Sequence, residues 1–358
     1  MFSERREFKQ LSPGIFLSLV LLLSSSVVNS GNFTSAENLN PESADIRLDT
    51  SFQDDAWVVY TYAIDEQGRV ADAQIRSSNG VSRVESAVLD KLSSMRFAPA
   101  TRDGQPVKVA ADPVIFTWIL DLPRAMSPQF SESYQAAWAF FQEGNYDAAF
   151  DLAVTLKDMP GRNALEEVRY QVLAASLASR WEDGAAELQH LGRAVELQAL
   201  ASKNNFKHHY IEADQYLLIL ERIQTLQLER MMLADAGTTL GEIQAHGAGT
   251  DIAVRAAAAY TAKELEFNAR PDATVSAELA PIYRDGPGAW KAGLSRNKFS
   301  ISDVKGKVDA VFLVCGPRDI QLRYPSVDPW VIPDGLKYCK IDVAGSAGTR
   351  FLLHQFAS

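Results

Sequence analysis

Hydrophobic and polar positions in the first third of the chain predict two strands, a helix and a third strand. Residues 57–64 are a run of aromatic and β-branched side chains, which suit a pleated strand. After a turn at 65–68, apolar and polar residues alternate from 71 to 76, as in a strand with one buried face. A helix is predicted from about Ser82 to Met95, because its apolar residues recur on one helical face. A third strand is expected from Val107 to Leu120.

The pattern becomes helical after Pro123. Residues 123–129 suggest a linker, and in residues 131–270 Ala, Leu, Glu and Gln are abundant while helix breakers are few. This change of composition predicts that residues 45–122 and 131–270 are separately folded domains.

One stretch of the helical segment, residues 137–160, resembles a tetratricopeptide unit. It has small and aromatic residues at the expected helix contacts, Gly144 at the turn and a closing Pro160. A second, weaker unit is centred on residues 174–185, where Trp181 follows Tyr146 by about 35 positions, near the 34-residue period. An irregular helical bundle is the other interpretation of the same residues.

The last segment, residues 281–358, turns to short β-rich runs punctuated by Gly and Pro, which predicts a small β-sandwich or barrel. Its candidate strands are Phe299–Ile301, Val308–Cys315, Ile320–Tyr324, Tyr338–Val343 and Thr349–His354. The two cysteines of the chain, Cys315 and Cys339, both lie here. We expect them to form a disulfide if the chain is exported, and two buried free thiols are the alternative.

The N-terminus has the layout of a secretory signal. Basic residues precede an apolar run from Ile15 to Val28 of about 14 residues, short of the roughly 20 that a membrane-spanning helix needs. Residues 1–30 are therefore expected to be a signal peptide cleaved after Ser30, or an uncleaved N-terminal anchor, with residues 31–44 as a linker. Either case places the bulk of the chain outside the cytoplasm.

Four short motifs in residues 45–122 resemble the TonB C-terminal domain family. They are Asp65-Glu66-Gln67-Gly68-Arg69-Val70, Ser77-Ser78-Asn79-Gly80, Arg96-Phe97-Ala98-Pro99-Ala100 and Asp103-Gly104-Gln105-Pro106-Val107. Their order and spacing match the family, although the Tyr-Pro pair that often precedes its first strand is missing. The chain is thus expected to be an α+β multidomain protein: a TonB-like strand-strand-helix-strand domain, a tetratricopeptide-like all-α array and a small C-terminal β domain.

The third strand is the candidate binding element. Pro113 cannot donate a backbone hydrogen bond, so it suits an edge strand or a bulge, where it either leaves room for a partner or only protects the edge from aggregation. The resemblance implies a partner at the same place, because family members pair this strand with a short segment of an outer-membrane transporter. The expected partner-binding residues are Val107, Val109, Ala111, Pro113 and Ile115.

Sequence patterns for chemistry are missing. There is no phosphate-binding loop, nucleophile elbow, zinc-binding H-E-x-x-H or C-x-x-C motif, so we expect no enzyme, no metal, no cofactor and no small-molecule substrate. The adjacent His208 and His209 and the acidic doublets Asp54-Asp55 and Glu166-Glu167 are most simply solvated surface. The net charge of −10, with no basic face, argues against nucleic acid.

What remains is protein binding. The favoured reading is a periplasmic interaction or scaffold protein whose TonB-like domain docks envelope partners, such as an outer-membrane transporter or an inner-membrane complex, by strand addition. The alternative is a TonB-type energy transducer that supports outer-membrane transport of a siderophore or another nutrient. A transducer needs a membrane helix and a long spacer, whereas only about 26 residues, reaching at most about 90 Å, separate Ser30 from Trp57.

Overall fold

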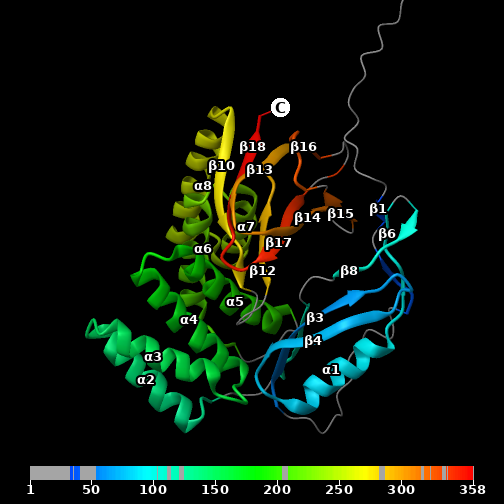
Figure 1. The fold of residues 1–358 in the computed structure, drawn as a ribbon. Coiled ribbons are helices and arrows are strands. Elements are labelled where there is room, and N and C mark those ends of the chain that lie inside the picture. The colour runs from blue at the N-terminus through cyan, green and yellow to red at the C-terminus, as the bar shows by residue number, and fades with distance from the viewer. Residues whose placement is uncertain are drawn as a thin grey trace, which may run out of the picture.

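The chain folds into three parts, which are arranged as Figure 1 shows. The computed structural model describes residues 33–34, 36–40, 54–102, 104–110, 114–120, 125–203, 209–281, 287–315, 318–322, 324–332, 336 and 338–357. The predicted signal segment, residues 1–30, and most of the predicted linker lie outside the described residues. We call the three parts the N-terminal sheet domain, the helical array and the β-sandwich.

The N-terminal sheet domain has the predicted strand-strand-helix-strand order. Its elements are β3 (Ala56–Ile64), β4 (Val70–Ser78), α1 (Ser82–Ser94), β8 (Val109–Ala110) and β9 (Val114–Trp118). All pairings are antiparallel, and β3 is central, with β4 on one side and both β8 and β9 on the other. Helix α1 buries Val84, Val88 and Leu92 against the sheet, as its apolar spacing predicts.

Short strands surround this sheet. They are β1 (Phe33–Thr34), β2 (Glu37–Asn38), β5 (Phe97–Ala98), β6 (Thr101–Arg102) and β7 (Gln105–Pro106). Strand β1 pairs with β6, and β2 pairs with β5. Part of the segment expected to be a linker is therefore fixed to the domain by backbone hydrogen bonds. No pattern of residues predicts these pairings, because a strand of two residues is too short to show alternation.

The helical array consists of three helix hairpins and one further helix. Its helices are α2 (Pro128–Gln142), α3 (Tyr146–Asp158), α4 (Ala164–Arg180), α5 (Gly184–Lys203), α6 (Ala213–Glu229), α7 (Leu233–Gly247) and α8 (Asp251–Ala269). The hairpins pair α2 with α3, α4 with α5 and α6 with α7, and α8 packs on both α6 and α7. Their start positions are not spaced at one fixed period, so the array is a set of helix hairpins of unequal length.

One turn geometry recurs in all three hairpins. Gly144, Glu182 and Met231 each lie two positions after the end of the first helix, and each has a positive φ. The next residue in each turn donates its backbone N–H to the carbonyl five positions earlier, to Phe140, Ala178 and Gln227 respectively. This is the Schellman arrangement that ends a helix. The same turn geometry is thus present in all three hairpins, although only the first turn uses glycine.

The β-sandwich consists of two sheets that share one core. Its strands are β10 (Asp272–Glu278), β11 (Ala280–Pro281), β12 (Pro287–Gly293), β13 (Lys298–Lys305), β14 (Val308–Cys315), β15 (Arg318–Leu322), β16 (Trp330–Val331), β17 (Cys339–Ser346) and β18 (Arg350–Phe356). The sheet orders are β10-β18-β13-β16 and β11-β12-β17-β14-β15. Alternate residues of β10 and β18 are buried, as expected where one face of a strand meets a core. Strand β10 occupies residues that the sequence pattern left unassigned.

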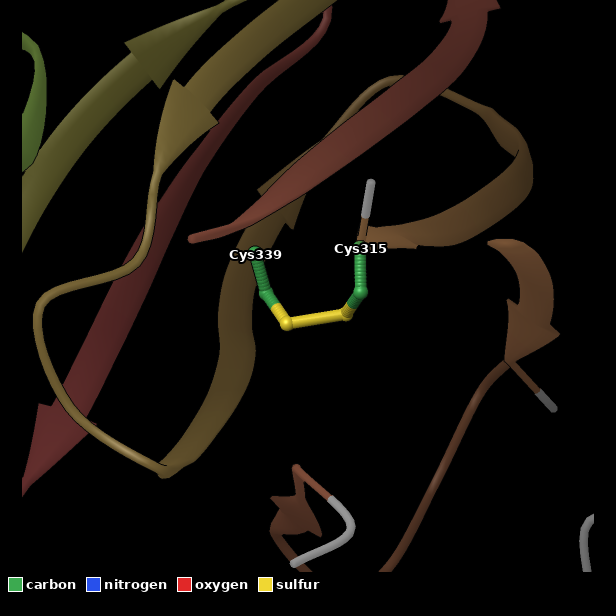
Figure 2. Close-up of a disulfide and its surroundings, with 2 residues drawn as sticks. All are labelled: Cys315 and Cys339. Carbon is green, nitrogen blue, oxygen red and sulfur yellow. A yellow bond between two sulfur atoms is a disulfide. The ribbon is translucent and has the colours of Figure 1, made fainter. Parts of the chain in front are cut away.

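The predicted disulfide is confirmed. Cys315 at the end of β14 and Cys339 at the start of β17 lie directly opposite each other, with Cα atoms 4.2 Å apart (Figure 2). Both are buried, so the bridge closes one end of this strand pair from inside the core. It joins the second predicted strand to the fourth.

The sandwich and the last helices of the array share a single hydrophobic core. Met231 and Met232 from the turn between α6 and α7, and Phe267 from α8, belong to the same buried cluster as Phe299 and Phe351 from the strands. Polar contacts reinforce this junction: Asp235 of α7 accepts the Gly293 N–H at 2.8 Å. The sandwich, which is small for an independent core, is therefore completed by helices.

A second polar contact holds the C-terminal end of α8. The Arg296 guanidinium donates to the carbonyls of Phe267, Arg270, Pro271 and Gln355, and it lies 4.3 Å from the Phe267 ring centroid. The last carbonyls of a helix have no hydrogen-bond donor within the helix, so Arg296 supplies donors to the end of α8. Across the described ranges, no helix combines the length and apolar character needed to cross a membrane.

Candidate partner-binding strand

Strands β8 and β9 form the outer side of the N-terminal sheet. Strand β9 pairs antiparallel with the first half of β3, from Ala56 opposite Trp118 to Tyr60 opposite Val114, and β8 pairs with its end. Among the described strands, none pairs with the other side of β8 or β9. An outer strand presents backbone N–H and C=O groups that a further strand can pair with.

The structure divides the predicted strand between two elements. Val109 lies in β8, where it pairs with Ile64, and Ile115 lies in β9, where it pairs with Val59. Val107 precedes β8, and its N–H donates to the carbonyl of Ala100. Ala111 and Pro113 lie outside the described residues, so the role predicted for Pro113 stays a prediction.

The end of the β9 segment is tied to the helical array by one buried carboxylate. Asp55, which precedes β3 and is only 3% exposed, accepts the Leu120 N–H at 3.1 Å and the Ala164 N–H at 3.0 Å. Ala164 is the first residue of α4, where backbone N–H groups lack helical acceptors and negative charge is favoured. Asp55 thus joins the candidate strand to the start of α4.

Asn79 makes the second link across the same boundary. Its side chain is 1% exposed, accepts the Trp57 N–H at 3.3 Å, and donates to the carbonyls of Asp55 at 2.8 Å and Arg162 at 3.0 Å. Its own carbonyl accepts the Gly161 N–H. The Arg162 guanidinium also lies over the Trp57 ring, 5.9 Å from the centroid. We call the contact formed by Asp55, Asn79 and residues 161–164 the seam.

Behind the seam, hydrogen bonds continue into the array. The Arg162 guanidinium donates to the Leu156 and Met159 carbonyls at the end of α3 and to the Glu167 carboxylate at 2.8 Å. Glu167 accepts from Gln171, whose Oε1 lies 2.7 Å from Nδ1 of His190 on α5. A buried polar network therefore runs from Asn79 to the second helix hairpin.

Burial shifts the pKa of groups along this network. Desolvation, reinforced by the Glu167 carboxylate, raises the pKa of Tyr170 to about 12. Burial also lowers the pKa of His190, with a smaller contribution from Lys157. Both groups are thus held uncharged at neutral pH. The two rings pack edge to face, with centroids 6.3 Å apart.

The acidic doublets correct the sequence prediction. Asp55, Glu166 and Glu167 were expected on a solvated surface, but all three are buried and hydrogen-bonded. Glu166 caps α4, because its carboxylate accepts the Asn163 and Ser127 N–H groups. The burial of Glu166 has one signal in the sequence, because Asn163 lies three residues before it, which is the spacing of a capping box.

The His, Cys, Asp and Glu side chains of the described residues were compared with the requirements of a metal site. No group of three or more His, Cys, Asp or Glu side chains within them is placed to hold a metal ion. Of the predicted surface histidine pair, His208 lies outside the described residues, and Nδ1 of His209 lies 2.7 Å from Nε2 of Gln198. The candidate site is the outer edge formed by β8 and β9.

Comparison with known proteins supports the assignment of the N-terminal sheet domain. No curated protein and no solved structure gave a match to the chain. The match to a family model covers residues 55–120, from Asp55 to Leu120, and the Leu120 N–H donates to the Asp55 carboxylate. In this segment, the chain is similar to the family described as Gram-negative bacterial TonB protein C-terminal.

Proposed function

We propose that this protein is a non-catalytic scaffold of the bacterial envelope, which captures an extended segment of a partner protein along β8 and β9. The observation that carries this proposal is the position of β9, which lies outside the central strand β3 and has no second strand partner among the described residues. Backbone pairing supplies affinity in such complexes, and side chains that face the partner supply selectivity.

The arrangement of the chain favours a scaffold over an energy transducer. The segment similar to the TonB C-terminal family ends at residue 120 of 358, and it is followed by the helical array, to which the seam holds it. A partner bound at β9 would therefore be held at a fixed position relative to the array. The implied partners are envelope proteins such as an outer-membrane transporter or an inner-membrane complex, and the implied location is the periplasm.

A proline scan of β9 tests strand addition. Alternate residues of an antiparallel strand direct their backbone groups toward the paired strand and away from it. Of Val114→Pro, Ile115→Pro, Phe116→Pro and Thr117→Pro, alternate variants should therefore keep the fold by circular dichroism, because they remove an N–H that points outward. The folded variants should lose a photo-crosslink between β9 and an extended peptide taken from an outer-membrane transporter.

The control is Thr155→Pro on α3, which should unfold part of the array instead. Strand addition is wrong if the folded β9 variants retain the crosslink at full yield. Sequencing the N-terminus of the mature protein separates the two functions, since cleavage after Ser30 excludes direct coupling to an inner-membrane motor.

A further inference from the structure

Two aromatic rings lie on the surface of the helical array and contact each other. Phe150 on α3 and Trp181 at the end of α4 are each 46% exposed, with ring centroids 5.4 Å apart in an edge-to-face arrangement. Val154, one helical turn after Phe150, is also exposed. These three side chains form a continuous apolar patch, which we call the aromatic patch.

The local fold does not require this tryptophan. The turns after α2 and α6 have the same backbone geometry as the turn after α4, and they place Glu143 and Arg230 where Trp181 stands. An exposed tryptophan is costly for solubility, and tryptophan is among the residues that contribute most to protein interfaces. Its position next to exposed Phe150 indicates a binding role.

Carboxylates surround the aromatic patch. Asp147 lies one turn before Phe150, Asp151 follows Phe150, and Glu182 follows Trp181; all three are exposed. Within the described part of the chain, none of these three carboxylates forms an ion pair. Two exposed cations also lie near the patch, Arg180 before Trp181 and Lys157 one turn after Val154, so the patch combines apolar rings with an excess of negative charge.

We propose that the aromatic patch docks a segment of a partner protein that carries Lys or Arg side chains next to an apolar one. The cation would lie over the Trp181 ring and near the carboxylates, while the apolar side chain would pack on Phe150 and Val154. A second copy of this chain fits less well, because its own net charge of −10 and its own carboxylates would face each other. An anionic lipid surface is disfavoured for the same reason. This surface is distinct from β9 and does not depend on strand addition.

The test uses the full chain and a defined pair of peptides. One labelled peptide of roughly 14 residues, about four helical turns, carries two leucines one turn apart with flanking lysines; the matched peptide has glutamate at every lysine. Fluorescence anisotropy measures the binding of each peptide to the wild type and to the variants. We expect the lysine peptide to bind in a salt-sensitive manner, and the glutamate peptide not to bind.

Trp181→Ala should weaken binding of the lysine peptide at least tenfold. Asp151→Lys and Glu182→Lys should weaken it as well, and they leave the apolar contacts in place, so a loss there cannot come from a misfolded patch. Tyr338→Ala, which removes a 93% exposed tyrosine from the β-sandwich, is the matched control and should change nothing.

Three outcomes would overturn the proposal. They are equal binding of the lysine peptide to Trp181→Ala, equal binding of the two peptides to the wild type, and no binding up to millimolar peptide. A dimer in sedimentation equilibrium that Trp181→Ala abolishes would assign the patch to self-association instead.

Discussion

Asn79→Ala should both destabilise the protein and uncouple its first two parts. The substitution removes the acceptor for the Trp57 N–H and the donor to the carbonyls of Asp55 and Arg162, all within the buried seam. Alanine offers no replacement for any of the three, and the seam is too well packed for water to enter freely.

The expected magnitude follows from the number of lost hydrogen bonds. A typical intramolecular hydrogen bond contributes about 1 kcal/mol, and a buried group left without a partner costs on the order of 1–3 kcal/mol. Three lost bonds at a side chain that is 1% exposed therefore predict a loss of about 3 kcal/mol in the free energy of unfolding. Asn79→Asp should cost at least as much, because it places a third oxygen against two carbonyl oxygens.

Urea unfolding gives the free energy, and hydrogen exchange shows where the protein has loosened. Exchange should rise on both sides of the seam, at Trp57 and at Gly161, while the β-sandwich stays protected. The control is Asn145→Ala, which removes an exposed helix cap on α3 and should cost only about 1 kcal/mol without affecting Trp57. A loss below about 1 kcal/mol for Asn79→Ala, with unchanged exchange at both sites, would refute the structural role of the seam.

Three further changes test other parts of the molecule. Replacing Cys315 and Cys339 by serine should lower the free energy of unfolding of the sandwich by roughly 3 kcal/mol, measured by urea unfolding, and wild-type protein should show the bridge in non-reduced peptide mass spectra. Burial keeps His190 neutral in the folded protein at a pH where it is already protonated in the unfolded chain. Stability should therefore fall as pH drops through about 6.5. His190→Gln should reduce that slope in thermal melts recorded from pH 7.5 to 5. Arg296→Ala should destabilise the junction of α8 with the sandwich by about 2–4 kcal/mol, whereas the exposed Arg350→Ala should have little effect in the same measurement.

Local patterns were enough to predict most elements of the fold. Alternating residues identified β4, and the spacing of Val84, Val88 and Leu92 identified α1. Short β-rich runs bounded by Gly and Pro identified β13, β14, β15, β17 and β18 of the sandwich. The pairing of the disulfide followed from two cysteines in one small module. In these cases the signal lies within one element, where periodicity is read directly from the residues.

The contacts between elements were not predictable in the same way. Asn79 was noted only as part of a motif, and Asp55 and Glu167 were assigned to solvent, because charged and polar residues are rarely buried without a partner. Their partners lie far along the chain: Asp55 binds the N–H of Ala164, and Asn79 binds the carbonyl of Arg162. Separate folding of residues 45–122 and 131–270 stays a prediction from composition, and the seam now argues against it.

The positions of the two junctions determine how this architecture can change in evolution. The seam contacts the array between α3 and α4, and the shared core contacts it at α6–α8. The hairpin of α4 and α5 therefore sets the separation between the N-terminal sheet domain and the sandwich. The sandwich also seals the apolar end of the array, as a capping repeat does. Insertion of a further helix pair between these two junctions would leave both the seam and the shared core in place. It would then move the two β domains apart by one step of the array.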